Sequence, residues 1–155
     1  MNANNKSGRL ILLSCCILIV VATLSGCTTT KELAKKYIEN AMDIDAEKTV
    51  TVPKDHFYVL SMSITSQKDV SIELEVEEGG NIDFLLMDKE GYDDYKDSMS
   101  TSYGYYPDGS KLNIKKTELS CTLPSNPYFI IDNTNRPSGG ADPTGSETEY
   151  LKVSS

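Results

Sequence analysis

The chain has 155 residues, 39% of them hydrophobic, and a formal net charge of −8 from 15 basic and 23 acidic residues. This length and composition fit one folded domain. A chain with this excess of acidic residues lacks the basic surface that binds a phosphate backbone, so we expect no nucleic-acid partner. The single His excludes a His-rich metal site, and the single long apolar run excludes a polytopic membrane protein.

The first 24 residues have the pattern of an export signal. Residues 1–9 are polar and carry Lys6 and Arg9, whereas residues 10–24 contain no charge. Fifteen helical residues would span roughly 22 Å, which is short of the roughly 30 Å hydrocarbon core of a bilayer. A short apolar stretch behind a basic start therefore predicts a secretory signal and not a membrane-spanning helix.

Residues 24–27 (LSGC) resemble the lipobox of prokaryotic lipoproteins. In that family the Cys thiol is alkylated by diacylglycerol and a peptidase cuts before it. The resemblance implies that residues 1–26 are a cleaved signal peptide and that Cys27 is the lipidated first residue of the mature protein. Acyl chains such as palmitate, at about 0.8 kcal/mol per buried CH₂, would then hold the protein on the extracytoplasmic side of the cell membrane. The alternatives are an ordinary signal peptide cut nearby and an uncleaved anchor.

Cleavage would change the cysteine count and the charge. Cys15 and Cys16 would leave with the signal and Cys27 would carry lipid, so Cys121 would remain the only free thiol. Loss of Lys6 and Arg9 takes the net charge from −8 to −10, a surface that anionic headgroups repel. Cys121 shares the apolar face of residues 119–123, which predicts a buried position.

The segment from residue 28 to residue 47 has a helical pattern. Leu33, Tyr37 and Ala41 recur at intervals of four residues, with charged residues between them. We expect a short helical tether over residues 27–47, between the lipid and the folded head. An amphipathic helix that binds a partner or the membrane surface is the alternative.

From residue 48 onward the apolar pattern changes to the period of two that is typical of strands. Val70, Ile72, Leu74 and Val76 alternate with polar residues, and residues 82–87 are apolar on both faces, as in a strand covered on both sides. A loop rich in Gly and Pro, residues 134–146, is expected to be mobile. The other predicted strands are residues 50–52, 56–64, 102–106, 111–115, 117–123, 127–133 and 147–153.

Eight or nine short strands predict an all-β domain over residues 48–155, an antiparallel, jelly-roll-like β-sandwich. A barrel is the alternative. Residues 107–110 (PDGS) are expected to form the turn of a hairpin between the strands at 102–106 and 111–115.

Three segments resemble a known group of small β-sandwiches: residues 83–88 (DFLLMD), 91–95 (GYDDY) and 127–134 (PYFIIDNT). The group comprises the bacterial pre-peptidase C-terminal (PPC) domains and the related GOLD (emp24-like) domains. The resemblance covers roughly residues 48–155. It implies a jelly-roll sandwich that acts as a binding, targeting or accessory module, since few members are catalytic on their own.

Five carboxylates lie within ten residues, and we consider them as ligands for calcium. Ca²⁺ prefers six to eight oxygen ligands from a bent loop, and some domains of the resembled group bind it. The spacing does not match an EF-hand, and an ordinary solvated loop is the alternative. The five residues are Asp88, Glu90, Asp93, Asp94 and Asp97.

Five of the nine tyrosines lie between residues 92 and 106, which suggests a binding surface. A Tyr side chain offers a flat apolar face and a hydroxyl group at small entropic cost, which suits recognition of a glycan or a protein. The alternative is that these side chains pack within the fold. They are Tyr92, Tyr95, Tyr103, Tyr105 and Tyr106.

No nucleophile, zinc or phosphate-loop motif occurs in the sequence. His56 is interpreted as a structural residue. Asp83 and Asp132 could approach each other as a glycosidase-type pair, but their places in hydrophobic strands favour structural hydrogen bonds. The leading hypothesis is a lipid-anchored, non-enzymatic binding or accessory module of the cell envelope, with an envelope protein or a glycan as its partner. An envelope hydrolase that uses surface carboxylates and a purely structural lipoprotein are the alternatives.

Overall fold

The computed structural model describes residues 37–97 and 102–155. All of them belong to one compact unit, Lys35–Ser155. The predicted signal peptide at residues 1–26 and the predicted lipid site at Cys27 lie outside the described residues.

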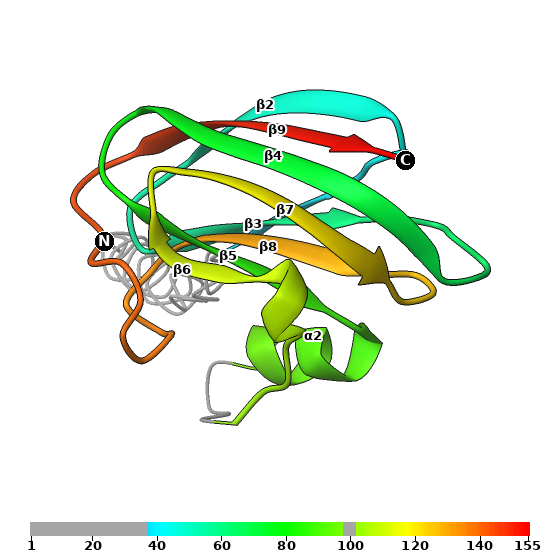
Figure 1. Ribbon diagram of the computed structural model, residues 1–155. Coiled ribbons are helices and arrows are strands. Elements are labelled where there is room, and N and C mark those ends of the chain that lie inside the picture. Colours follow the sequence, from blue (N-terminus) through cyan, green and yellow to red (C-terminus); the bar gives the residue numbers. More distant parts are fainter. Residues whose placement is uncertain (1–36, 98–101) are drawn as a thin grey trace, which may run out of the picture. The chain divides into compact units, whose positions relative to one another are not determined.

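Nine strands in two facing sheets make up most of this unit (Figure 1). In chain order they are β1 (Tyr37–Ala41), β2 (Ala46–Val52), β3 (His56–Ser61), β4 (Lys68–Glu78), β5 (Ile82–Met87), β6 (Lys111–Ile114), β7 (Lys116–Leu123), β8 (Tyr128–Asn133) and β9 (Glu147–Ser154). The five-stranded sheet has the order β1-β3-β8-β5-β6, and the four-stranded sheet has the order β2-β9-β4-β7. The predicted β-sandwich is confirmed.

The expected helix over residues 28–47 is wrong for the part that the structure describes. Residues 37–41 form β1, which pairs in parallel with β3, and β2 begins at Ala46. Tyr37 stacks on Phe57 of β3 with ring centroids 5.4 Å apart. Pairing with a neighbouring strand has overridden the local helical pattern. The β1–β3 pair also departs from the expected antiparallel arrangement, which holds for the other strand pairs.

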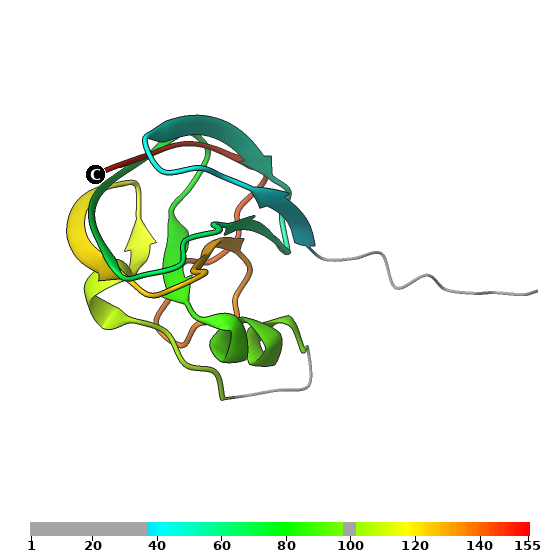
Figure 2. The ribbon, with the colours of Figure 1, turned by 90° about the vertical axis from the view of Figure 1, so that its right-hand side faces the viewer.

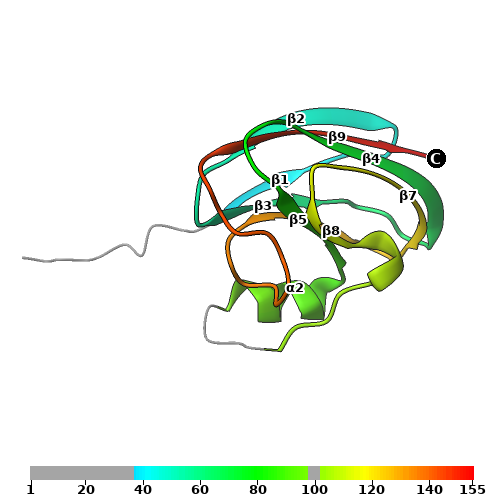
Figure 3. The same ribbon diagram turned by 60° about the vertical axis from the view of Figure 1, so that its left-hand side comes forward.

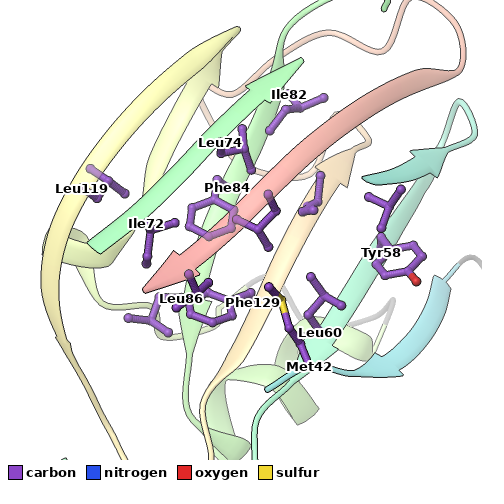
Figure 4. Close-up of a cluster of buried hydrophobic side chains, with 14 of the residues drawn as sticks. Met42, Tyr58, Leu60, Ile72, Leu74, Ile82, Phe84, Leu86, Leu119 and Phe129 are labelled. Atoms are coloured by element: carbon purple, nitrogen blue, oxygen red, sulfur yellow. The ribbon is translucent and has the colours of Figure 1, made fainter. Parts of the chain in front are cut away.

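The main hydrophobic core lies between the two sheets (Figure 4). Ile72 and Leu74 of β4 point into it as their alternation predicts, while the acidic residues of β4 point outward. Phe84 and Phe129 stack on neighbouring strands with ring centroids 5.5 Å apart. Every residue of β5 is buried, as the apolar run at residues 82–87 predicts for a strand that is covered on both faces.

A second, smaller core lies on the outer face of the five-stranded sheet, where helix α2 (Lys89–Lys96) covers it (Figure 2). Tyr92 and Tyr95 of α2 pack there with Leu85 and Ile130. The sequence pattern gave no indication of this helix. The strand expected at residues 102–106 is absent, and the 3-10 helix η1 (Pro107–Gly109) replaces the predicted hairpin turn.

The segment between β8 and β9 extends past the five-stranded sheet to the level of α2 before it joins the other sheet (Figure 3). It is the Gly- and Pro-rich loop of residues 134–146. The composition of this loop predicts mobility, but hydrogen bonds attach it to the five-stranded sheet. The backbone N–H of Ala141 donates to the carboxylate of Asp83, and the backbone N–H of Thr134 donates to that of Asp132.

Candidate binding surface

The structure separates the five tyrosines of the expected binding surface into two groups. Tyr92 and Tyr95 are 2% and 0% exposed beneath α2, so they belong to the fold. Tyr103 is half-buried, whereas Tyr105 and Tyr106 are exposed by 40% and 38%. Tyr105 and Tyr106 are the exposed large hydrophobic side chains of the described residues.

Two hollows flank the segment of residues 102–110. The larger, about 480 Å³, is lined by Tyr106, η1 and the C-terminal half of β7, including Cys121. The smaller, about 270 Å³, is lined by Tyr103, Tyr105 and Pro137 among others. The first part of this segment, with Tyr103 and Tyr105, therefore borders the smaller hollow, and the part from Tyr106 to Gly109 borders the larger one.

Hydrogen bonds fix this segment to β5. The backbone N–H of Tyr106 donates to the carbonyl of Leu86 at 2.8 Å, and the N–H of Leu86 donates to the hydroxyl of Ser110 at 2.8 Å. The Tyr106 hydroxyl donates to Asp88 at 3.3 Å. A segment held in this way loses little conformational freedom when a ligand binds, which favours recognition.

Arg136 connects the segment to α2. Its guanidinium carbon lies 4.4 Å from the ring centroid of Tyr95 and 5.9 Å from that of Tyr103. It also donates hydrogen bonds to the backbone carbonyls of Tyr95 and Asp97 at the end of the helix, where a positive charge is favourable. Nothing in the sequence pattern singled out Arg136, because its partners lie about forty residues earlier in the chain.

Asp83 and Asp132 are register partners on β5 and β8, and both are 0% exposed. Asp132 accepts hydrogen bonds from the Tyr95 hydroxyl and from the backbone N–H and hydroxyl of Thr134. Asp83 accepts from the N–H groups of Asn113 and Ala141, at 2.7 and 2.9 Å.

Burial raises the pKa of both carboxyl groups, that of Asp132 to about 6, although their hydrogen bonds oppose the shift. Their oxygens are closed off from solvent and bonded to the protein. The interpretation as structural hydrogen bonds therefore fits better than that of a glycosidase-type pair: Asp132 holds α2 and the start of the 134–146 loop, and Asp83 holds the loop and β6.

The five acidic residues of the calcium hypothesis lie on or beside a helix, not on the bent loop that the hypothesis assumed. Asp88 is the N-cap and accepts from the Gly91 N–H at 2.9 Å. Asp93 forms ion pairs with Lys89 and Lys96. The other three, Glu90, Asp94 and Asp97, are exposed. Within residues 37–97 and 102–155, no group of three His, Cys, Asp or Glu side chains is placed to hold a metal ion.

Cys121 and His56 occupy structural positions. Cys121 is half-buried against the main core, and burial raises the pKa of its thiol, which disfavours a reactive thiolate. His56 Nδ1 lies 2.8 Å from the carbonyl oxygen of Lys54. The structural role of His56 agrees with its interpretation from the sequence, whereas Cys121 is less buried than its apolar pattern predicts, because its side chain also borders the larger hollow.

Comparison with known proteins gives structural similarity only. No family model and no curated protein matches the sequence. A pre-peptidase C-terminal domain of collagenase from Bacillus anthracis is 18% identical with a TM-score of 0.49, and covers 76% of this chain and 95% of its own. A periplasmic lysozyme inhibitor of g-type lysozyme from Aeromonas hydrophila is 10% identical with a TM-score of 0.40, over 76% of this chain and 96% of its own.

The assignment to the β-sandwich class rests on the two sheets themselves, and the resemblance to PPC domains stays a prediction. In the part of the chain that the structure describes, no helix is both long and apolar enough to cross a bilayer.

Proposed function

We propose that this protein is a lipid-anchored binding module on the extracytoplasmic side of a cell membrane and that it is not an enzyme. Its ligand, an envelope protein or a glycan, would contact residues 102–110. The observation that carries the proposal is the exposure of Tyr105 and Tyr106 on one hydrogen-bonded segment between two hollows.

Exposure of these two rings to water costs free energy. Soluble domains bury most large aromatic side chains, and exposed Tyr residues are enriched where proteins meet their partners. Tyr105 and Tyr106 are exposed, whereas Tyr92 and Tyr95 on the preceding helix are buried. Their hydroxyl groups and adjacent hollows suit a ligand that has both apolar and polar groups.

A capture experiment tests the surface. The mature form, residues 28–155 without lipid, would be used as bait against envelope extracts and a glycan array. We expect Tyr105→Ala with Tyr106→Ala to abolish capture of any ligand that the unchanged protein retains. Tyr150→Ala is the matched control, because Tyr150 lies on the four-stranded sheet and bonds to Glu47. Unchanged capture by the double Tyr variant, or loss of capture in the Tyr150→Ala control, would contradict the proposal.

The lipid anchor is tested separately. Cys27→Ala should release the protein from the membrane fraction and remove the mass of the acyl chains. Membrane attachment of the Cys27→Ala chain, with a mass changed only by the substitution, would show that Cys27 is not the lipid site. This outcome would leave the binding surface untouched, so the two parts of the proposal can fail independently.

A further inference from the structure

Glu149 lies on the inward face of the four-stranded sheet. Its strand, β9, runs between β2 and β4, and its register partners on the two sides are Val50 and Val76. The side chain is 0% exposed. The carboxyl group of Glu149 therefore lies among aliphatic side chains in the interior of the sandwich.

Neither oxygen of the Glu149 carboxyl has a hydrogen-bond partner among the described residues, and the same holds for Asn133 Oδ1. The neighbouring carboxyl of Glu147 is different, because it accepts from the Thr144 hydroxyl at 3.0 Å and from the N–H of Gly80. Both oxygens of the Glu149 carboxyl thus lack a donor, and a proton on this group would remove its unpartnered charge.

The charged groups around Glu149 do not compensate a negative charge. On its own strand the neighbour is Glu147, also acidic. On β2 the inward-facing cation is Lys48, whose Nζ lies 5.8 Å from the ring centroid of Tyr58 on β3. His56, also on β3, is turned to the carbonyl of Lys54. The inward residues of β4 are aliphatic: Val70, Ile72, Leu74 and Val76.

An ionised carboxylate without a partner is costly in such surroundings, so the neutral form is favoured. We propose that Glu149 is a proton-binding site inside the fold and that folding takes up one proton at neutral pH. Burial, followed by the nearby charge of Glu147, raises the pKa of Glu149 to about 8, which agrees with the geometry.

The consequence is a sandwich whose stability falls as its surroundings become alkaline. The unfolded chain loses this proton at about pH 4.5, but the folded chain keeps it up to about pH 8. Between these values, each rise of one pH unit increases the unfolding equilibrium constant up to tenfold. Glu149 lies on β9, an inner strand between β2 and β4, so ionisation of its carboxyl group destabilises the four-stranded sheet with or without a ligand.

Urea unfolding of the full chain between about pH 6 and about pH 8 tests the proposal. Glu149→Gln has the shape of the protonated side chain and cannot ionise. We expect its unfolding constant to lie below that of the unchanged protein already at the lower pH, and the ratio between the two constants to grow by at least a further tenfold towards the upper pH. Glu118→Gln, on the exposed face of β7, is the matched control and should keep the original pH profile. Equal pH profiles for Glu149→Gln and the unchanged protein would overturn the proposal.

A direct titration covers the case in which Glu149→Gln does not fold. In carbon NMR of the unchanged protein, one Glu carboxyl should titrate above about pH 7. Titration of every Glu below about pH 5.5 would overturn the proposal. Stabilisation by calcium in the unchanged protein but not in Glu149→Gln would overturn it too, because the carboxylate would then be charged and paired with a cation.

Discussion

Two pairs of buried carboxyl groups in this molecule have opposite surroundings. Asp83 and Asp132 face the helix and the loop outside the five-stranded sheet, and both accept hydrogen bonds from the protein. Glu147 and Glu149 face the interior from β9, and there only Glu147 has partners within the described residues. All four are 0% exposed. Burial alone therefore does not determine whether a carboxyl group stabilises the fold. The hydrogen-bond donors around the group determine it.

The pKa values express the same difference. Burial raises the pKa of Asp132 and of Glu149, but the bonds from Tyr95 and Thr134 limit the rise for Asp132 to about 6. Glu149 has no such side-chain donor, and its pKa rises to about 8. We expect Asp132 to be ionised and Glu149 to be neutral at neutral pH.

The largest expected effect comes from removing the bonded carboxylate. Asp132→Ala would leave the Tyr95 hydroxyl and the Thr134 N–H buried without an acceptor, so we expect a loss of about 3–4 kcal/mol in the free energy of unfolding. Urea denaturation measures it. Asp94→Ala, on the exposed side of α2, is the control and should change stability by less than about 0.5 kcal/mol. A loss below about 1 kcal/mol in Asp132→Ala would contradict this role.

Replacement of the Glu149 carboxyl, which has no hydrogen-bond partner among the described residues, is expected to increase the free energy of unfolding. Glu149→Met replaces it with an apolar side chain of similar length, and we expect a gain of about 2 kcal/mol in the free energy of unfolding near neutral pH. The same urea experiment measures this gain. A clear destabilisation at every pH would mean that the Glu149 carboxyl has a bonding partner.

The contribution of Tyr95 to the bonded pair should be intermediate. Tyr95→Phe keeps the ring contacts with Phe57 and Arg136 but removes the hydroxyl that donates to Asp132. We expect a loss of about 1–2 kcal/mol. In a double-mutant cycle, the effect of Tyr95→Phe should largely disappear in the Asp132→Ala background. Simple additivity would show that the bond between them contributes nothing.

The pH profile separates the two pairs. A carboxyl group whose pKa is higher in the folded chain than in the unfolded chain stabilises the fold fully only below its pKa in the unfolded chain. As the pH rises from there to the pKa in the folded chain, this stabilisation is lost at up to about 1.4 kcal/mol per pH unit. Asp132 therefore contributes a slope up to about pH 6, while the contribution of Glu149 continues to about pH 8. We expect Asp132→Asn to change how steeply the free energy of unfolding varies with pH only below about pH 6. A changed slope above about pH 6.5 would mean that the two sites are coupled.

The smallest effect on stability is expected at the proposed binding surface. Tyr105→Ala and Tyr106→Ala remove rings that are already 40% and 38% exposed, so each should cost less than about 1 kcal/mol. Thermal unfolding measures this cost. A larger loss would indicate that the rings support the fold and are not kept for a ligand.

Much of the sandwich could be predicted because alternation reports directly on burial. The strand at residues 68–78 and the doubly buried strand at 82–87 were clear for this reason. Helix α2 could not be predicted, because its short sequence contains a Gly and is held in place by two Tyr side chains packed on the neighbouring β5 and on β8, which lies far along the chain. The strand β1 depends in the same way on its pairing with β3.

The candidate site was less accessible to sequence reasoning. Proximity of Tyr103 to Arg136 and of Asp83 to Asp132 depends on strand register and on the path of the 134–146 loop, which no local pattern encodes. Glu149 was accessible, because it has the same parity as the inward-facing Leu151 and Val153. The buried acidic position could therefore have been read from alternation alone.

The most direct test compares Asp132→Asn with Glu149→Gln in one series of urea unfolding experiments at about pH 7.5. Each variant replaces a buried carboxyl with an amide of the same shape. The account predicts a clearly larger gain in stability for Glu149→Gln than for Asp132→Asn, because the pKa of Glu149 is raised further and the Asp132 carboxylate accepts hydrogen bonds that an amide loses in part. An equal or larger gain for Asp132→Asn would contradict it, because the two carboxyl pairs would then be equivalent.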